Sequence, residues 1–288
     1  MLFVVLLLSW LAVQLWRDIA PLQQDSWLPA WRRWVDKNCS DLFGETVAMI
    51  ILLLLPVLAV GLLLQFFGDW FFGLLGLLIN MVAVLYACGR DDPFEALSAY
   101  RRSLSEGFPA ARRTAEQYYG VTANSFSDLH RAVWHCASYG SYERWFAAVF
   151  WFVLLGAPAA VFYRICLLSS QRNEGEDAVG TPDSRAEKIE QIIYWLDWFP
   201  SRCWAFLYAL AADFSTVYPL LKEGLVEVIG ARQLLARVSI AASGAAAEQA
   251  LDSHDPALAA DALTGLESLL LRVMIAGLVA AAIFTIFL

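Results

Sequence analysis

Long apolar runs alternate with polar stretches along the chain. Four of these runs are residues 1–15, 47–67, 70–88 and 269–288. A helix needs roughly 20 apolar residues to cross a bilayer, and the first run is short of that length. Only Gly68-Asp69 separates the second run from the third, which favours an antiparallel helical hairpin. The pattern predicts an all-α, polytopic membrane protein with about four transmembrane helices.

A fifth apolar run, residues 145–168, is interrupted by Gly156-Ala157-Pro158. Proline lacks a backbone N–H and crowds the preceding turn, so it kinks or ends a helix. Two arrangements fit this run: a kinked transmembrane helix, or a re-entrant hairpin of two half-length helices. We favour the hairpin. With the N-terminus outside, it leaves the polar loops that carry Lys and Arg on the cytoplasmic side, as positive charge prefers.

The same pattern divides the chain into six parts. They are N-terminal membrane helices with a surface loop (1–88), a cytoplasmic helical segment (89–144), the embedded element (145–168), a linker (169–184), cytoplasmic or interfacial helices (185–268) and a C-terminal transmembrane helix (269–288). Caps and prolines predict several helix ends: a start at Asp92-Pro93, an end at Gly120, a cap at Ser127, and one long final helix from Asp255-Pro256.

Composition supports a membrane protein and excludes some functions. Of the 288 residues, 59% are hydrophobic, a fraction that soluble domains rarely reach. The net charge of −8 argues against a nucleic-acid partner, which would need a basic face. The five cysteines form no CxxC pair, which favours buried, reduced thiols. His130 and His135 are five residues apart and so lie on different faces of a helix, which speaks against a metal site.

No nucleotide-binding or hydrolase motif such as GxGxxG, Walker A, HExxH or GxSxG occurs in the sequence. We therefore expect no catalytic residue, no metal and no cofactor.

Two segments resemble a known family. They are residues 150–164 (FWFVLLGAPAAVFYR) and 196–202 (LDWFPSR). The chain resembles the AmpE family, bacterial inner-membrane proteins encoded beside the AmpD amidase and tied to β-lactamase induction. It is also similar to the wider CobD/CbiB family of cobalamin-pathway membrane synthases, in which a Tyr-Arg pair precedes an Asp-x-x-Pro-x-Arg pattern. The resemblance implies a multi-pass protein of the bacterial inner membrane.

Departures from the synthase pattern argue against an enzyme. Where the synthases carry glutamates, this chain has His135 and Tyr139, and only Glu143, where they carry aspartate, stays acidic. The Asn-Thr-Leu-Asp-like turn after the Tyr-Arg pair is replaced by the residues 167–170 (LLSS). Carboxylates that could hold Mg²⁺ and phosphate are therefore missing. The resemblance implies that the scaffold remains without the ATP-dependent amide-ligase chemistry.

Arg164 is the residue that physical chemistry alone singles out. An arginine in an apolar run costs a few kcal/mol or more unless it has a partner or reaches the interface. One interpretation is a structural ion pair or a snorkelling arginine. The other is an anion-binding residue at the membrane face, with Arg202 nearby and Asp197 orienting one of the two. The candidate ligand-binding residues are Arg164, Arg202, Asp197, Tyr163 and Glu143.

Three functions remain open. The first is a regulatory or signalling protein of the AmpE type, linked to β-lactamase induction and cell-wall sensing, that binds an anionic ligand or a partner at its cytoplasmic face. The second is a CobD/CbiB-like adenosylcobinamide-phosphate synthase. The third is a transporter or channel, for which only Gln65 and Asn80 offer polar groups within the spans. We favour the first, with membrane lipid and an anionic cell-wall fragment or other small molecule as partners.

Overall fold

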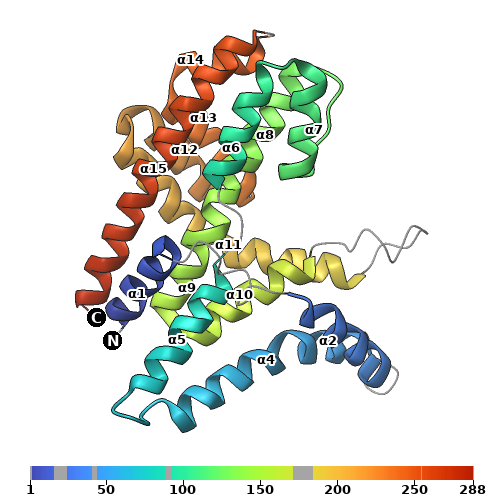
Figure 1. The fold of residues 1–288 in the computed structure, drawn as a ribbon, viewed down its shortest axis with the longest axis vertical. Coiled ribbons are helices and arrows are strands. Elements are labelled where there is room, and N and C mark those ends of the chain that lie inside the picture. Colours follow the sequence, from blue (N-terminus) through green and yellow to red (C-terminus); the bar gives the residue numbers. More distant parts are fainter. Residues whose placement is uncertain are drawn as a thin grey trace. The chain divides into compact units, whose positions relative to one another are not determined.

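The computed structural model describes residues 2–15, 25–40, 44–88, 93–170, 184–253 and 255–287. Every regular element in these ranges is a helix, so the all-α prediction is confirmed (Figure 1). The chain forms two compact units. The first unit contains residues 1–90, 148–196 and 281–288, and the second contains residues 91–147 and 197–280.

The first unit is built around the helix α10. Its elements are α1 (Leu2–Leu15), α2 (Trp27–Val35), the π-helix η2 (Asp36–Ser40), α4 (Glu45–Phe67), α5 (Leu74–Ala87), α9 (Ala148–Leu155), α10 (Ala157–Ser170) and the first part of α11 (Ser184–Ala211). The helix α10 contacts α4, α5 and α9, while α1 packs on α5 and α2 packs on α4. A buried cluster joins η2 to α4 and consists of Val35, Cys39, Ala48 and Leu52.

The second unit is built around the helix α8. Its elements are α6 (Pro93–Leu104), α7 (Phe108–Tyr119), α8 (Phe126–Ser141), the π-helix η3 (Tyr142–Ala147), the rest of α11, α12 (Phe214–Val226), α13 (Ala231–Ser243), α14 (Ala245–Asp252) and most of α15 (Pro256–Phe287). The helix α8 contacts α6, α7, α13 and α14. In its buried interface with α13, the Trp134 indole N–H donates a 3.0 Å hydrogen bond to the Ser239 hydroxyl.

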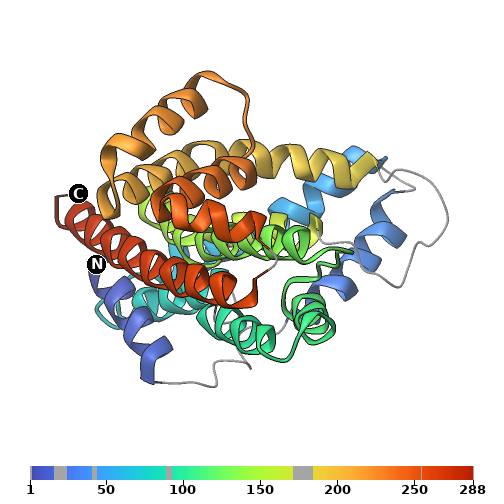
Figure 2. The ribbon, with the colours of Figure 1, turned by 90° about the horizontal axis from the view of Figure 1, so that it is seen from above.

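Local sequence signals fixed several helix ends correctly. Gly120 ends α7 in the left-handed conformation, with φ of +64°, as predicted. The helix α15 begins at Pro256, where the Asp255 carboxylate accepts a hydrogen bond from the Ala257 N–H. It runs without interruption to Phe287, as Figure 2 shows from above. Asp92 lies outside the described residues. The predicted cap at Ser127 is wrong, because Ser125 caps α8 through the Asp128 N–H.

Two helices are long and apolar enough to cross a membrane: α4, and the part of α15 from Pro256 to Thr285. Among the described residues, the structure therefore supports two of the about four predicted transmembrane helices and does not confirm the others. The helix α5 has 14 residues, about 21 Å at 1.5 Å per residue, which is shorter than a hydrocarbon core of about 30 Å.

The chain between α4 and α5 is a longer turn than predicted. Phe71 and Phe72 have φ of 53° and 60°, and Gly73 has 81°, so the right-handed helix restarts only at Leu74. The predicted two-residue link and the start of a span at residue 70 are therefore wrong. The side chains at this turn project outward, and Phe72 is completely exposed.

The run at 145–168 contains the predicted break. The helix α9 ends at Leu155 and α10 begins at Ala157, with Gly156 between them at φ of +84° (Figure 1). The two helices point in clearly different directions in this view. Whether the pair re-enters a bilayer or crosses it stays a prediction. Most of the predicted linker, residues 171–183, lies outside the described residues.

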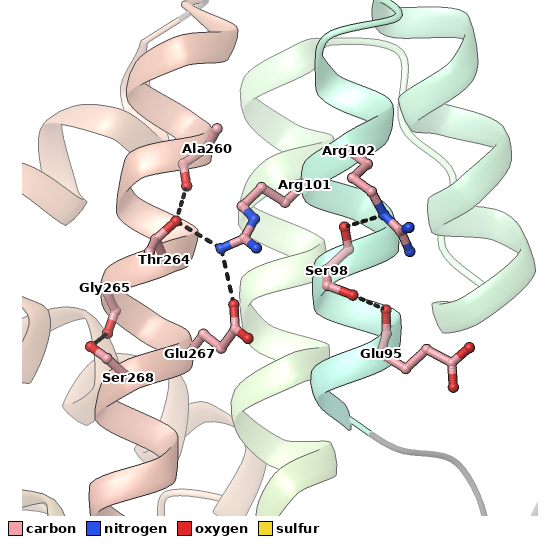
Figure 3. A network of polar contacts seen from close by, with 9 residues as sticks. All are labelled: Glu95, Ser98, Arg101, Arg102, Ala260, Thr264, Gly265, Glu267 and Ser268. Carbon is pink, nitrogen blue, oxygen red and sulfur yellow. Dashed lines mark hydrogen bonds and ion pairs between the residues drawn. The ribbon is translucent and has the colours of Figure 1, made fainter.

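One basic residue of the second unit ties α6 to α15. The Arg101 Nη1 donates to the Glu267 carboxylate at 3.0 Å and to the Thr264 hydroxyl at 2.9 Å (Figure 3). The neighbouring Arg102 lies on another side of α6 and donates to the Ser98 carbonyl of its own helix. Adjacent arginines therefore have different roles: Arg101 holds two helices together and Arg102 is exposed.

Candidate functional site

The structure divides the five predicted site residues between the two units. Tyr163 and Arg164 lie on α10 in the first unit. Glu143 on η3, and Asp197 and Arg202 on α11, lie in the second. Each group is therefore described with the neighbours inside its own unit.

Asp197 is a buried carboxylate held by two tyrosines. The Tyr139 hydroxyl donates to Oδ2 at 2.6 Å and the Tyr142 hydroxyl donates to Oδ1 at 2.9 Å. Only 2% of the residue is exposed. A buried carboxylate is costly unless donors satisfy it, and hydrogen bonds to a charged group are stronger than those between neutral groups. The pair of phenols therefore stabilises the junction of α11 with α8 and η3.

The two phenols remain protonated over a wide range of pH. Burial raises the pKa of Tyr139 well above its ordinary value, and the negative charge of Asp197 raises it further. The pKa of Tyr142 is raised by the same two causes in the same order. The Arg232 guanidinium lies over the Tyr139 ring, with Cζ 4.5 Å from the ring centroid. The cation therefore lies over one face of the ring, while the hydroxyl in the ring plane donates to Asp197, and both contacts hold Tyr139 in place.

Arg202 is buried and directs its guanidinium at backbone oxygens. Its Nε and Nη2 donate to the Gly224 carbonyl at 3.2 and 2.9 Å, and Nη2 donates to the Ile229 carbonyl at 2.9 Å. Its Nη1 donates to the Trp198 carbonyl at 3.0 Å, and Cζ lies 4.7 Å from the Trp198 ring centroid. The contacts stabilise the turn between α12 and α13.

Arg164 faces an acidic partner in the first unit. Its Nη2 lies 3.5 Å from Oδ2 of Asp25, just before α2, and both side chains are mostly buried. A separation of 3.5 Å is long for a charge-assisted hydrogen bond. The Nε of Arg164 is buried and has no hydrogen-bond partner among the described residues. The next residue back, Tyr163, is completely buried in α10.

Glu143 lies on the π-helical stretch η3 and is partly exposed. Single π-helical turns inside helices often mark functional sites. Here the wider turn begins at Tyr142, so it affects which way the second phenol points. The negative charge of Glu143 also raises the pKa of Tyr139, after burial and Asp197.

Several residues at these positions were not found from the sequence. They are Tyr142 and Arg232 around Asp197, Asp25 beside Arg164, and the carbonyls of Gly224 and Ile229 around Arg202. One signal was available: Tyr139 and Tyr142 are three apart and so share a helix face. Nothing in the sequence pointed to Asp25, which lies 139 residues before Arg164.

The geometry of these groups suits hydrogen bonding and the positioning of helices. Arg164 offers a buried donor, which suits a small anion or a polar headgroup, and the Asp25 carboxylate beside it would compete for the same guanidinium. Among the described residues, no group of three His, Cys, Asp or Glu side chains lies close enough to hold a metal ion.

Of three comparisons with known proteins, only the comparison with family models gives a match. No curated protein and no solved structure matches the chain. A family model described as "Regulatory signalling modulator protein AmpE" matches residues 1–287. That match covers nearly the whole chain, so the protein belongs to the AmpE family of regulatory signalling modulators.

Proposed function

We propose that this protein is a non-catalytic, multi-pass regulator of the bacterial inner membrane, linked to β-lactamase induction and cell-wall sensing. The family match over residues 1–287 supports a regulatory signalling role. The two helices long enough to cross a bilayer support a membrane location. The exposed face of α4 is rich in large apolar side chains, including Leu58, Leu62 and Phe66, as lipid contact requires.

The proposed sensing residue is Arg164, with Asp25 beside it. The observation that carries this choice is the loose pairing of Arg164: its Nη2 lies 3.5 Å from Oδ2 of Asp25, farther than Arg185 lies from Asp36, and its buried Nε has no hydrogen-bond partner among the described residues. Leaving a buried donor unsatisfied costs about 1–3 kcal/mol. An anionic cell-wall fragment or another small anion would accept a hydrogen bond from this Nε and would compete with Asp25 for the guanidinium. Tyr163, adjacent in the chain, positions α10 within its unit.

The other predicted residues have a different proposed role. Arg202 donates to three backbone carbonyls, and Asp197 accepts from two tyrosines. Both are therefore proposed to hold the second unit in a defined shape, while ligand binding is assigned to Arg164. The same use of Asp197 supports a regulator over an amide ligase, because a buried carboxylate whose two oxygens accept from phenols is poorly placed to hold Mg²⁺ or phosphate. Uptake of ATP with magnesium by the purified protein would favour the ligase instead.

The test compares two buried arginines of the first unit. Arg164→Gln removes the proposed anion-binding charge, and Arg185→Gln removes the charge of Arg185, which pairs with Asp36. We expect Arg164→Gln to abolish the change in β-lactamase expression on exposure to a β-lactam, and Arg185→Gln to preserve it. Native mass spectrometry of the gently extracted protein should show an anionic small molecule that is lost in Arg164→Gln.

Two outcomes would contradict the proposal. One is normal induction by an Arg164→Gln protein that accumulates at the normal level. The other is loss of the folded protein in Arg164→Gln together with rescue by Arg164→Lys without a bound anion, because that pattern indicates a purely structural ion pair.

A further inference from the structure

The turn between α12 and α13 presents aliphatic side chains to the outside of the second unit. Val226 is 81% exposed and Val228 is 86% exposed, and Leu225 beside them is also exposed. Isolated apolar residues on a surface are common, but a contiguous apolar patch marks an interaction site.

The buried Arg202 fixes the shape of this turn. Its guanidinium binds the carbonyl of Gly224 before the turn and the carbonyl of Ile229 at its end. Both residues are buried, whereas the residues between them point outward. The turn is therefore held rigidly in a shape that exposes Val226 and Val228, and it loses little conformational entropy on binding.

Aromatic residues extend this apolar surface along α12 and back to α11. Phe214 and Tyr218 are stacked with ring centroids 5.2 Å apart, and Phe206 meets Phe214 edge-on at 6.4 Å. Phe214, Tyr218 and Leu225 follow at intervals of four and seven residues, so they share one face of α12. All of these rings are partly exposed. We call the surface formed by Phe206, Phe214, Tyr218, Leu225, Val226 and Val228 the apolar strip.

The apolar strip begins where α11 packs against α15. A Cβ added at Gly277 of α15 would lie 3.1 Å from the Trp204 ring and 3.4 Å from Leu207, so these helices are in close contact. Nearer the end of α11, Arg272 donates to the Ala211 carbonyl at 3.3 Å. The helix α15 is one of the two that could cross a membrane. Phe206 therefore lies on a helix that is packed along the apolar half of α15.

We propose that the apolar strip is a lipid-binding surface, with α12 lying in the interface of the bilayer that α15 enters. This inference rests on the membrane location proposed above. Stacked Phe and Tyr side chains suit the boundary between headgroups and acyl chains. Lys222 lies on the same face of α12 and suits a lipid phosphate. Glu227, between Val226 and Val228, limits the depth of the turn to that boundary.

The test replaces single exposed residues of the full chain with a photo-crosslinking amino acid in the native membrane. The change Val226→p-benzoyl-phenylalanine probes the apolar strip. The same change at Ile275 probes the exposed face of α15, and at Arg112 it probes an exposed site on α7. We expect a mass increase of one phospholipid at Val226 and at Ile275, and none at Arg112.

The controls separate failure of this inference from failure of the proposed function. A phospholipid adduct at Ile275 together with only protein or water adducts at Val226 would overturn the lipid-binding strip and leave the membrane location intact. No phospholipid adduct at Ile275 would overturn the membrane location itself. Equal phospholipid adducts at Val226 and Arg112 would also overturn the inference, since the apolar strip would not differ from the rest of its unit.

Discussion

The hydroxyl of Tyr139 donates a 2.6 Å hydrogen bond to the Asp197 carboxylate, and both side chains are buried. The Tyr142 hydroxyl, one turn later in the chain, donates a 2.9 Å hydrogen bond to the other oxygen of the same carboxylate. A segment of α11 is therefore joined to α8 and η3 through one charged group. Because the charge is buried, each donor that it loses has a large effect on stability.

Removing either hydroxyl should destabilise the second unit. We expect Tyr139→Phe and Tyr142→Phe each to lower the free energy of unfolding by about 1–3 kcal/mol, because the buried carboxylate then lacks a donor. Tyr118→Phe is the control, since Tyr118 is exposed on α7. The measurement is unfolding in a mild detergent. A loss no larger than that of the control would mean that Asp197 does not depend on these phenols.

Those features that depend on local chemistry could be predicted from the sequence. Gly120 ends a helix because it adopts positive φ without strain, and Pro256 begins one because it needs no N–H partner. The break at Gly156 was also predictable, since a glycine and a proline fall close together inside an apolar run. These signals act over a few residues, so tertiary packing did not override them.

Contacts between distant parts of the chain could not be predicted in this way. Tyr139 and Asp197 are 58 residues apart, and Arg202 binds a carbonyl 27 residues later. Hydrophobic periodicity fixes which face of a helix is buried, but it does not fix the helix that it meets. The start of α5 was missed for another reason: Phe71 and Phe72 are apolar enough for a span, yet both have positive φ.

Replacement of Arg202 by lysine should be strongly destabilising although it preserves the charge. A lysine ammonium cannot match the planar fork that meets the carbonyls of Gly224 and Ile229 together. We expect Arg202→Lys to lower the free energy of unfolding by about 3 kcal/mol. It should also speed proteolysis between residues 224 and 229.

Arg237→Lys is the matched control, because Arg237 makes an exposed ion pair with Glu223 at 3.5 Å. Such pairs contribute about 0–1 kcal/mol. If the two variants have the same stability, the role of Arg202 as a clamp of this turn is wrong.

The stability of the second unit should fall on acidification because of His130. This residue is completely buried among Tyr100, Phe126 and Trp134. Burial lowers its pKa from 6.5 to about 4. Between these two values the unfolded chain binds the proton and the folded chain does not, so stability is full above about pH 6.5 and is lost as the pH falls toward 4.

His130→Phe removes this titration. When the pH is lowered from about 7.5 to about 5, the free energy of unfolding should fall by about 2 kcal/mol more in the wild-type protein than in the variant. Burial and the charge of Arg131 also lower the pKa of His135. Because His135 is present in both proteins, its titration cancels in the comparison, which therefore isolates His130. Parallel pH profiles for the two proteins would show that His130 is not buried as a neutral group.

Two glycines of α15 should respond in opposite ways when a side chain is added. A Cβ at Gly265 meets nothing within 4 Å, so Gly265→Ala should stabilise the protein by about 0.5–1 kcal/mol through helix propensity. A Cβ at Gly277 would lie 3.1 Å from Trp204 and 3.4 Å from Leu207, closer than ordinary contacts. Gly277→Val should therefore destabilise by about 1–3 kcal/mol. Thermal unfolding of Gly265→Ala and of Gly277→Val checks the contrast. A stabilising Gly277→Val would mean that α11 and α15 are not packed together at this position, and the apolar strip would then lose its connection to the membrane helix.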